Sequence, residues 1–218
     1  MRARDLVVVC GKIASGKSRA CADAIKETDY QVLQLDRLAV HLRLHNDEFR
    51  NEFRTWCIAI GLEHRDRAPD VDRFLFSNIL FNQFAQDSGF RFFRAYLDIQ
   101  RPYLQYHLDQ LIAETPALII EVAVPPIMTG LKLPPHRGFI VDAGLNAEER
   151  VALVQARGSA MTAPFIRGML RYQEQLFAGY NGVLCGLRGY ETFTSYDGKD
   201  WVPGDIWASR FQLHGNHL

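Results

Sequence analysis

The sequence predicts an α/β fold in which one parallel sheet of five strands is covered by helices on both faces. Two observations support this prediction. Short apolar runs with the length of buried strands recur along the chain, at residues 6–10, 31–35, 117–121, 138–142 and 182–185. Stretches with helical periodicity separate them, at residues 19–27, 37–44, 146–157 and 162–177. Strands that alternate with helices are typical of a parallel sheet, because each parallel connection needs a crossover.

The first apolar run passes directly into a glycine-rich motif. Gly11-x-x-x-x-Gly16-Lys17-Ser18 follows Cys10, and this spacing is the phosphate-binding P-loop pattern. Glycine at these positions allows backbone turns that a Cβ atom would block, so that successive N–H groups face a phosphate. A helix that begins at Lys17 points the positive end of its dipole to the same place. A chance match is the alternative, but a preceding strand and a following helix are the context that the motif requires.

The motif predicts a role for each of its residues. We expect Lys17 to reach the β- and γ-phosphates of ATP and the Ser18 hydroxyl to bind Mg²⁺. The nucleotide is expected to contact the loop and the start of the helix, at Gly11, Ala14, Ser15, Gly16, Lys17, Ser18 and Arg19. The motif does not identify the phosphate acceptor.

Two acidic residues follow strands at the edge where ligands bind in such sheets. Asp36 comes directly after the second strand, and Glu121 ends the third. We expect Asp36 to orient and deprotonate an acceptor hydroxyl, although it could also cap the helix at 37–44. Glu121 could bind Mg²⁺ through water.

The composition indicates which kinds of ligand and which cellular compartment to expect. The 218 residues, 48% of them hydrophobic, fit one α/β domain with a small insertion. Lys plus Arg and Asp plus Glu balance at 25 each, which argues against nucleic acid as the main ligand. No apolar run approaches the length of a membrane span, and we expect a small-molecule substrate. The four cysteines are far apart and lack C-x-x-C pairing, which favours reduced thiols in a cytoplasmic protein. The oligomeric state is not predicted.

The chain divides into a core and two additions. Residues 1–46 and 116–186 form the predicted core, with a lid near 157–173. Residues 47–115 are helical in pattern nearly throughout, too long for a simple crossover, and are predicted to be a substrate-binding insertion. Residues 187–218 are a C-terminal extension, in which 191–202 read as a β-hairpin that turns at Asp197-Gly198. We expect its aromatic residues to pack on the flank of the domain, with a base-stacking surface as the alternative.

The order of these features resembles the dephospho-coenzyme A kinase family, which phosphorylates a ribose 3′-hydroxyl in the last step of coenzyme A synthesis. The similarity runs from about residue 6 to residue 185. The family has G-x-x-G-S-G-K-S and then V-I-D-A-D-x-I-A, and residues 32–39 here read V-L-Q-L-D-R-L-A. Asp36 matches the second family Asp, while Gln34 replaces the first. The resemblance implies the P-loop kinase fold, the cofactors ATP and Mg²⁺, and action of Asp36 on the acceptor hydroxyl.

Weaker family motifs follow in the same order. The D-R-x-x-L-x-x-x-V-F helix appears at 72–81, which implies that Arg73 binds substrate. The H-P pair appears as Arg101-Pro102, so the His is replaced. The V-P-L-L-F-E loop appears at 124–129, with Pro125 retained and Thr129 in place of the Glu. The resemblance thus implies an acceptor pocket bordered by Asp36, Arg73, Arg101 and Pro125.

The family's lid, an Arg followed by a helix ending in A-A-Q, resembles residues 157–173. It implies that Arg157 contacts the nucleotide and neutralises charge on the transferring phosphoryl group. Simpler roles remain open: Arg157 could be a helix-end residue stabilised by the dipole, and Arg73 could pair with neighbouring aspartates. His41 and His45 have the i, i+4 spacing of a metal-binding pair, but no H-E-x-x-H motif accompanies them.

These observations predict a kinase that transfers the γ-phosphoryl group of ATP to a hydroxyl of a nucleotide-like molecule, with dephospho-coenzyme A as the expected acceptor. Two alternatives stay open. One is a nucleoside or nucleoside-monophosphate kinase, and the other is a catalytically silent nucleotide-binding protein that acts through a partner. The departures at Gln34, Arg101 and Thr129 concern the acceptor side.

Overall fold

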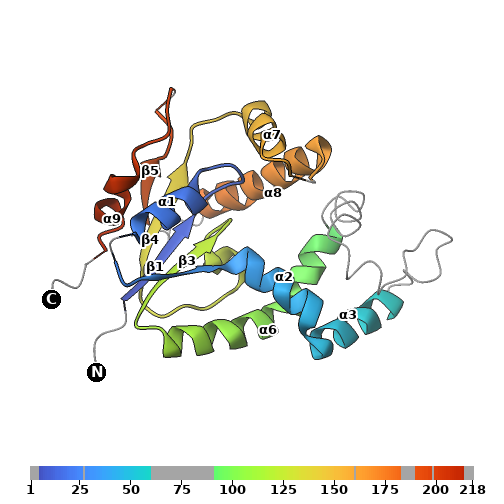
Figure 1. Cartoon of the computed structure of the whole chain (residues 1–218). Coiled ribbons are helices and arrows are strands. Elements are labelled where there is room, and N and C mark those ends of the chain that lie inside the picture. Colours follow the sequence, from blue (N-terminus) through green and yellow to red (C-terminus); the bar gives the residue numbers. More distant parts are fainter. Residues whose placement is uncertain are drawn as a thin grey trace.

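A computed structural model describes residues 5–26, 28–59, 91–159, 161–182, 190–197 and 199–213. Its centre is a five-stranded sheet (Figure 1) made of β1 (Asp5–Cys10), β2 (Gln31–Gln34), β3 (Ala117–Val122), β4 (Arg137–Asp142) and β5 (Tyr190–Thr194). The strand order is β2-β3-β1-β4-β5, and every neighbouring pair is parallel. The strand that leads into the P-loop therefore lies in the middle of the sheet.

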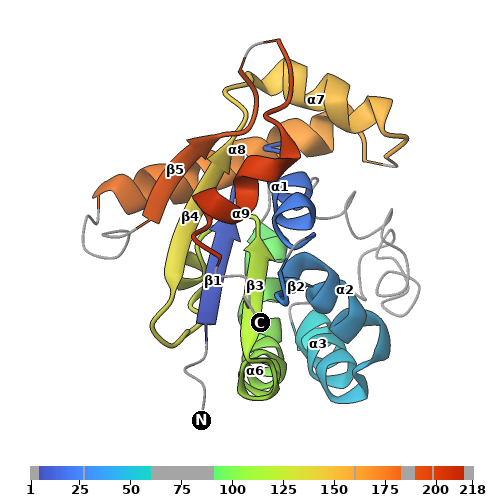
Figure 2. The ribbon, with the colours of Figure 1, turned by 60° about the vertical axis from the view of Figure 1, so that its left-hand side comes forward.

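Side chains of β1 alternate between two cores, as the period of a strand requires. Leu6 and Val8 pack with α2 (Leu35–His45) and α6 (Arg91–Glu114). Val7 and Val9 pack with α1 (Lys17–Ala24) and α9 (Trp207–Arg210) on the opposite face. Helices thus cover both faces of the sheet (Figures 1 and 2), which confirms the predicted three-layer α/β/α arrangement.

Two further helices, α7 (Ala147–Ala156) and α8 (Ala163–Gly182), pack against each other near the P-loop. Asn146 and Glu149 form a capping box at the start of α7, as the sequence predicts. An apolar cluster then joins both helices to the P-loop; it contains Ala14, Val151, Val154, Ile166 and Leu170.

The region predicted to be a helical insertion contains α3 (Asp47–Ala59) in addition to α6. Phe49 and Phe53 of α3 are fully buried and meet Tyr96 of α6 edge-on, with ring centroids 5.6 and 5.5 Å apart. The prediction for residues 60–90, including Arg73, lies outside the described residues. None of the described helices has the length and apolar composition needed to cross a membrane.

The fifth strand of the sheet lies later in the chain than predicted. The apolar run at 182–185 does not form it, because Gly182 ends α8 and residues 183–185 lie outside the described residues. The fifth strand is β5, which pairs in parallel with β4 and which the sequence assigns to the first arm of a hairpin. An edge strand and a hairpin arm share the same alternation of polar and apolar residues, so the pattern does not separate them. Of the predicted hairpin, an antiparallel bridge between Tyr196 and Trp201 is present.

Residues 195–213, called here the C-terminal segment, continue through η3 (Gly204–Ile206) and α9 and pack on α1. Trp207 and Phe211 are almost completely buried there. Gly204 lies so close to α1 that a Cβ atom would be 2.8 Å from Cγ of Asp23. The segment therefore completes the core behind the P-loop helix.

Candidate active site

The P-loop joins β1 to α1, and its two motif glycines are required by close approaches. A Cβ atom at Gly11 would lie 2.3 Å from the carbonyl oxygen of Val141 in β4. Gly16 has φ +82°, a left-handed conformation that glycine adopts readily, and a Cβ atom there would lie 2.6 Å from Cζ3 of Trp201. Neither position accepts a side chain without displacing the backbone or its neighbours.

Ala14 also adopts the left-handed conformation, with φ 57°. This costs a non-glycine residue roughly 1–2 kcal/mol, and the resembling family has glycine at this position. In return, the methyl group is buried in the apolar cluster with α7 and α8. The chain thus keeps the loop conformation and uses the extra methyl to pack the loop against these helices.

The loop presents the groups that an anion needs. The N–H groups of Ala14 and Gly16 have no hydrogen-bond partner within the described residues. The helix α1 begins at Lys17, so its first N–H groups are also available. The Lys17 ammonium makes no ion pair in the described part of the chain. Free N–H groups at a helix N-terminus beside a free cation form a phosphate site.

Asp36 lies at the same edge of the sheet, in the first turn of α2. The helix begins two residues earlier than predicted, with Gln34 at the N-cap position and no side-chain cap hydrogen bond, so Asp36 is not its cap. The residue is exposed to solvent, although many protein atoms surround its carboxyl group. This crowding raises the pKa of Asp36, the nearby Lys17 ammonium opposes the rise, and Glu121 adds to it.

Glu121 connects the P-loop to β2. The register of β3 sets Glu121 between Val9 of β1 and Gln34 of β2. Its Oε1 accepts a hydrogen bond from the Ser18 hydroxyl, and its Oε2 accepts one from the Gln34 amide at 2.8 Å. The carboxylate is almost completely buried, with 6% of the residue exposed, and both of its oxygens have partners.

The pair formed by Ser18 and Glu121 has the chemistry that Mg²⁺ requires. Both are hard oxygen donors, and P-loop enzymes hold Mg²⁺ with the P-loop hydroxyl and an acidic residue on a neighbouring strand. The ion usually keeps several waters and takes further oxygens from substrate phosphates, so two protein groups are sufficient. Sequence reasoning raised Glu121 only as a water-mediated ligand, and its contact with Ser18 strengthens that role.

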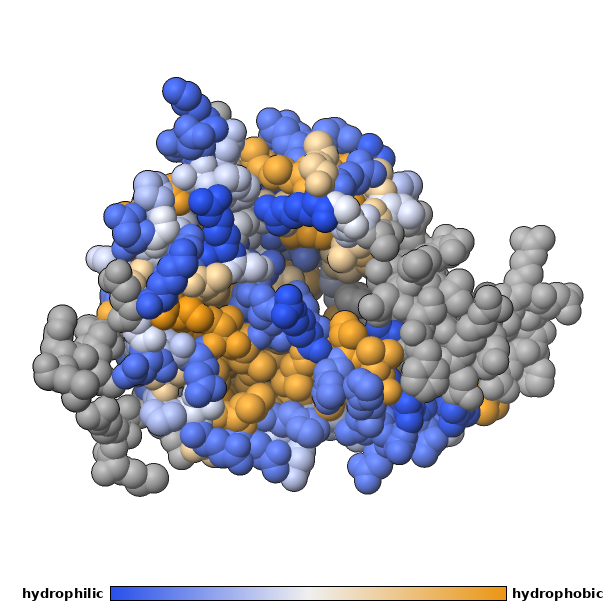
Figure 3. All heavy atoms as spheres, viewed as in Figure 1, coloured by the Kyte–Doolittle hydropathy of each residue, from blue (hydrophilic) through white to orange (hydrophobic). Residues whose placement is uncertain are grey.

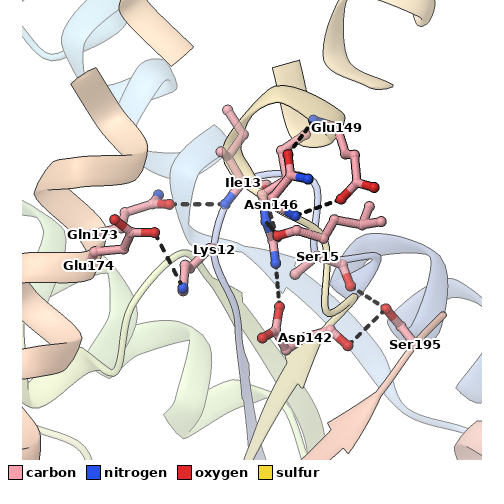
Figure 4. A network of polar contacts seen from close by, with 11 residues as sticks. Lys12, Ile13, Ser15, Asp142, Asn146, Glu149, Gln173, Glu174 and Ser195 are labelled. Atoms are coloured by element: carbon pink, nitrogen blue, oxygen red, sulfur yellow. Dashed lines mark hydrogen bonds and ion pairs between the residues drawn. The ribbon is translucent and has the colours of Figure 1, made fainter. Parts of the chain in front are cut away.

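Helices α7 and α8 hold the outside of the P-loop (Figure 4). Gln173 of α8 is buried and accepts a hydrogen bond from the Ile13 N–H at 2.9 Å. Arg150 of α7 donates to the Ile13 carbonyl at 3.0 Å. Glu174 lies 3.7 Å from the Lys12 ammonium. Both polar groups of Ile13 are therefore bonded to these helices and not to a ligand.

The surface of the molecule has a hollow on the side viewed in Figure 3. In the space-filling view, the hollow lies between the part of the molecule that contains α7 and α8 and the part that contains α2 and α6 (Figure 3). In α/β sheets, ligands bind at this position, outside the carboxyl ends of the strands.

No family model matches the chain, and no curated protein matches it either. Solved structures do match it. One is the crystal structure of TT1252 from Thermus thermophilus, which is 21% identical, has a TM-score of 0.60 and covers 98% of this chain and 100% of its own. At this identity the likeness concerns the fold alone. The chain has a three-layer α/β/α fold with a five-stranded parallel sheet, and its P-loop follows the central strand β1. It thus has the architecture that the resemblance implies, with the motif residues at the carboxyl edge of the sheet.

The two arginines near the predicted lid have different surroundings. Arg157 follows α7 and is exposed, and its guanidinium makes no hydrogen bond or ion pair within the described residues. Arg150 is 3% exposed and bonds to the carbonyls of Leu145 and Ile13 and to the Asp142 carboxylate. Arg157 is available to a nucleotide, whereas Arg150 is committed to holding the P-loop.

Two of the three replaced acceptor-side residues, Arg101 and Thr129, are in contact with each other. Arg101 of α6 donates through Nε to the carbonyl of Thr129 at 2.6 Å and pairs with Asp98. Thr129 ends the short helix η2 (Pro126–Thr129), and its hydroxyl donates to the Pro126 carbonyl at 2.7 Å. Pro125 is buried just before this helix. Arg101 is therefore already bonded to protein groups, and it fixes the loop that follows β3.

The remaining candidates show no catalytic arrangement in the described residues. The rings of His41 and His45 lie 4.6 Å apart, and no group of three His, Cys, Asp or Glu side chains forms a metal site there. Cys10, Cys21 and Cys57 are buried, and no disulfide joins them. Burial raises the pKa of Cys10 to about 12 despite the nearby Lys17, so this thiol is not a nucleophile.

Proposed function

We propose that this protein is an ATP-dependent kinase that phosphorylates a hydroxyl of a nucleotide-like acceptor. The observation that supports this most strongly is the convergence of four groups at one edge of the sheet. Lys17 has no ion-pair partner in the described residues, Ser18 bonds to Glu121, and Asp36 lies close enough to both charges for each to change its pKa. These are the parts that phosphoryl transfer needs.

Each group has a separate task in the proposed reaction. The free N–H groups of the P-loop and the Lys17 ammonium bind the phosphates and stabilise the charge that spreads over the transferring group. Ser18 and Glu121 would hold Mg²⁺, which would neutralise negative charge on the phosphates. Asp36 orients the acceptor hydroxyl and takes its proton as the new P–O bond forms. Arg157, free in the described structure, adds positive charge from the lid side.

The acceptor that we propose first is the ribose 3′-hydroxyl of dephospho-coenzyme A. The order of motifs supports it, and Asp36 lies at the position that the resemblance implies. The three replaced residues take part in hydrogen bonds within the protein, because Gln34 bonds to Glu121 and Arg101 bonds to Thr129. These same contacts support a second candidate, a kinase of a different nucleoside or nucleotide, because the replaced residues that make them lie on the acceptor side.

A substrate panel tests this proposal. The purified chain, with ATP and Mg²⁺, should phosphorylate dephospho-coenzyme A faster than nucleosides or nucleoside monophosphates, as followed by ADP release and by mass spectrometry of the product. A strong preference for a nucleoside monophosphate would select the second candidate. Nucleotide binding without turnover of any acceptor would instead support a catalytically silent protein that acts through a partner.

A further inference from the structure

The C-terminal segment contacts the P-loop through Ser195, a residue that no motif identifies. Ser195 directly follows β5 and is 2% exposed. Its hydroxyl donates to the Ser15 carbonyl at 2.5 Å, and its N–H donates to the Asp142 carbonyl at 2.8 Å. Figure 4 shows its side chain between the end of β4 and the P-loop. The hydroxyl is therefore held in one position against the loop.

This hydrogen bond determines the direction of one P-loop peptide group. The peptide between Ser15 and Gly16 is trans, and in a planar trans peptide the carbonyl and the N–H point to opposite sides. Because the Ser15 carbonyl faces Ser195, the Gly16 N–H faces away from the C-terminal segment. Trp201 of the same segment packs on Gly16 and limits its movement.

The same arrangement recurs at a second free N–H of the loop. The Ile13 carbonyl accepts a hydrogen bond from Arg150, so the N–H of Ala14, in the same peptide, points the opposite way. Like the Gly16 N–H, the Ala14 N–H has no partner in the described part of the chain. In both peptides, the carbonyl is fixed from outside the loop and the N–H is left for a ligand.

We propose that Ser195 is a positioning residue for phosphate binding, because it holds the Gly16 N–H toward the phosphate before the nucleotide arrives. Donors that are already oriented need no reorganisation when charge arrives, which is how fixed dipoles contribute most. The inference rests on the proposed function only because it requires the P-loop to bind phosphate. It goes beyond the proposed function because it assigns the C-terminal segment, which lies outside the family resemblance, to the nucleotide site.

The test is calorimetric titration of the full chain with magnesium pyrophosphate, a probe that occupies the phosphate positions without a base. Ser195→Ala removes one buried hydrogen bond and should raise the Kd by about fivefold to tenfold. Ser195→Thr keeps the hydroxyl and should restore the Kd to within about twofold of the parent. Tyr196→Phe is the matched control, since it removes a neighbouring hydroxyl that donates to the Lys199 carbonyl and does not contact the P-loop.

Thermal melts without ligand show whether each variant is folded. If Ser195→Ala does not fold, Ser195→Cys, with a weaker donor of similar shape, should raise the Kd in the same direction. A folded Ser195→Ala that binds pyrophosphate as well as Tyr196→Phe would overturn the inference and leave the kinase proposal intact, as would a folded Ser195→Thr without rescue. Failure of the parent chain to bind pyrophosphate or ATP would overturn both.

Discussion

At the scale of single residues, Lys17 carries a charge that no ion pair neutralises in the described structure. Its Ala variant should lose the cation that stabilises the transferring phosphoryl group, an effect of ~3 kcal/mol or a rate factor of ~10² or more. The fold should survive, because the ammonium bonds to no described group. Lys26→Ala, at the other end of the same helix, removes an exposed lysine and is the control. Near-normal turnover of Lys17→Ala would refute the kinase assignment.

Asp36 carries the chemistry of the acceptor. Asp36→Asn keeps the shape but cannot take a proton, so kcat should fall by about 10²-fold, the lower end of general-base effects, because phosphoryl transfer has a loose transition state. ATP affinity should stay nearly unchanged, since the P-loop sets it. Asp47→Asn replaces an acidic residue in the first turn of the next helix and should leave kcat unchanged. A kcat for Asp36→Asn within a few-fold of the parent would require another base.

The pH dependence of the parent enzyme gives an independent measure of Asp36. Crowding by the protein disfavours the charged carboxylate and raises its pKa, so a larger share of the base is protonated at mildly acidic pH. The acid limb of the kcat profile should therefore lie above the pH at which an ordinary aspartate titrates. Asp36→Asn should remove this limb from its residual activity, and persistence of the limb would assign it to another group.

At the scale of elements, the sequence predicted four strands well and misplaced the fifth. The inner strands β1 and β3 have long apolar runs because all but the first residue of each is buried. β5 lies at the edge of the sheet, and three of its five residues, Glu191, Thr192 and Thr194, are exposed. Its pattern therefore resembles a hairpin arm. The apolar run at 182–185 was the stronger strand signal, yet its first residue belongs to α8.

Some residues of the candidate site depend on local sequence patterns, and others depend on contacts between distant parts of the chain. The P-loop and Asp36 could be predicted, because each depends on a local pattern at the end of a strand. Arg150, Gln173 and Ser195 could not, because their roles arise from contacts across 137, 160 and 180 residues of sequence. A buried arginine or serine leaves no periodic signal. Only the fold shows that they surround the same loop.

At the scale of the whole molecule, the C-terminal segment is part of the domain and not an addition to its flank. Its Ser195, which directly follows β5, donates a hydrogen bond to the P-loop. Its Trp207 and Phe211 belong to the core that also contains residues of α1. The guanidinium of Arg210 lies 5.0 Å from the Trp207 ring and 5.3 Å from the Phe193 ring, which links α9 to β5. The stability of the P-loop helix should therefore depend on this segment.

Trp207→Ala tests this dependence. Trp207 is 2% exposed and packs on Phe211 with ring centroids 5.3 Å apart. Loss of a buried Trp side chain costs about 3–5 kcal/mol, a large part of the roughly 5–15 kcal/mol that holds a typical domain together. The melting temperature should fall by roughly 10 °C, and urea unfolding should show the same loss. Tyr106→Ala, at a residue that is 60% exposed on α6, is the control and should melt close to the parent. Equal melting of the two variants would mean that the C-terminal segment is not part of the cooperative core, and the positioning role of Ser195 would then lack its structural support.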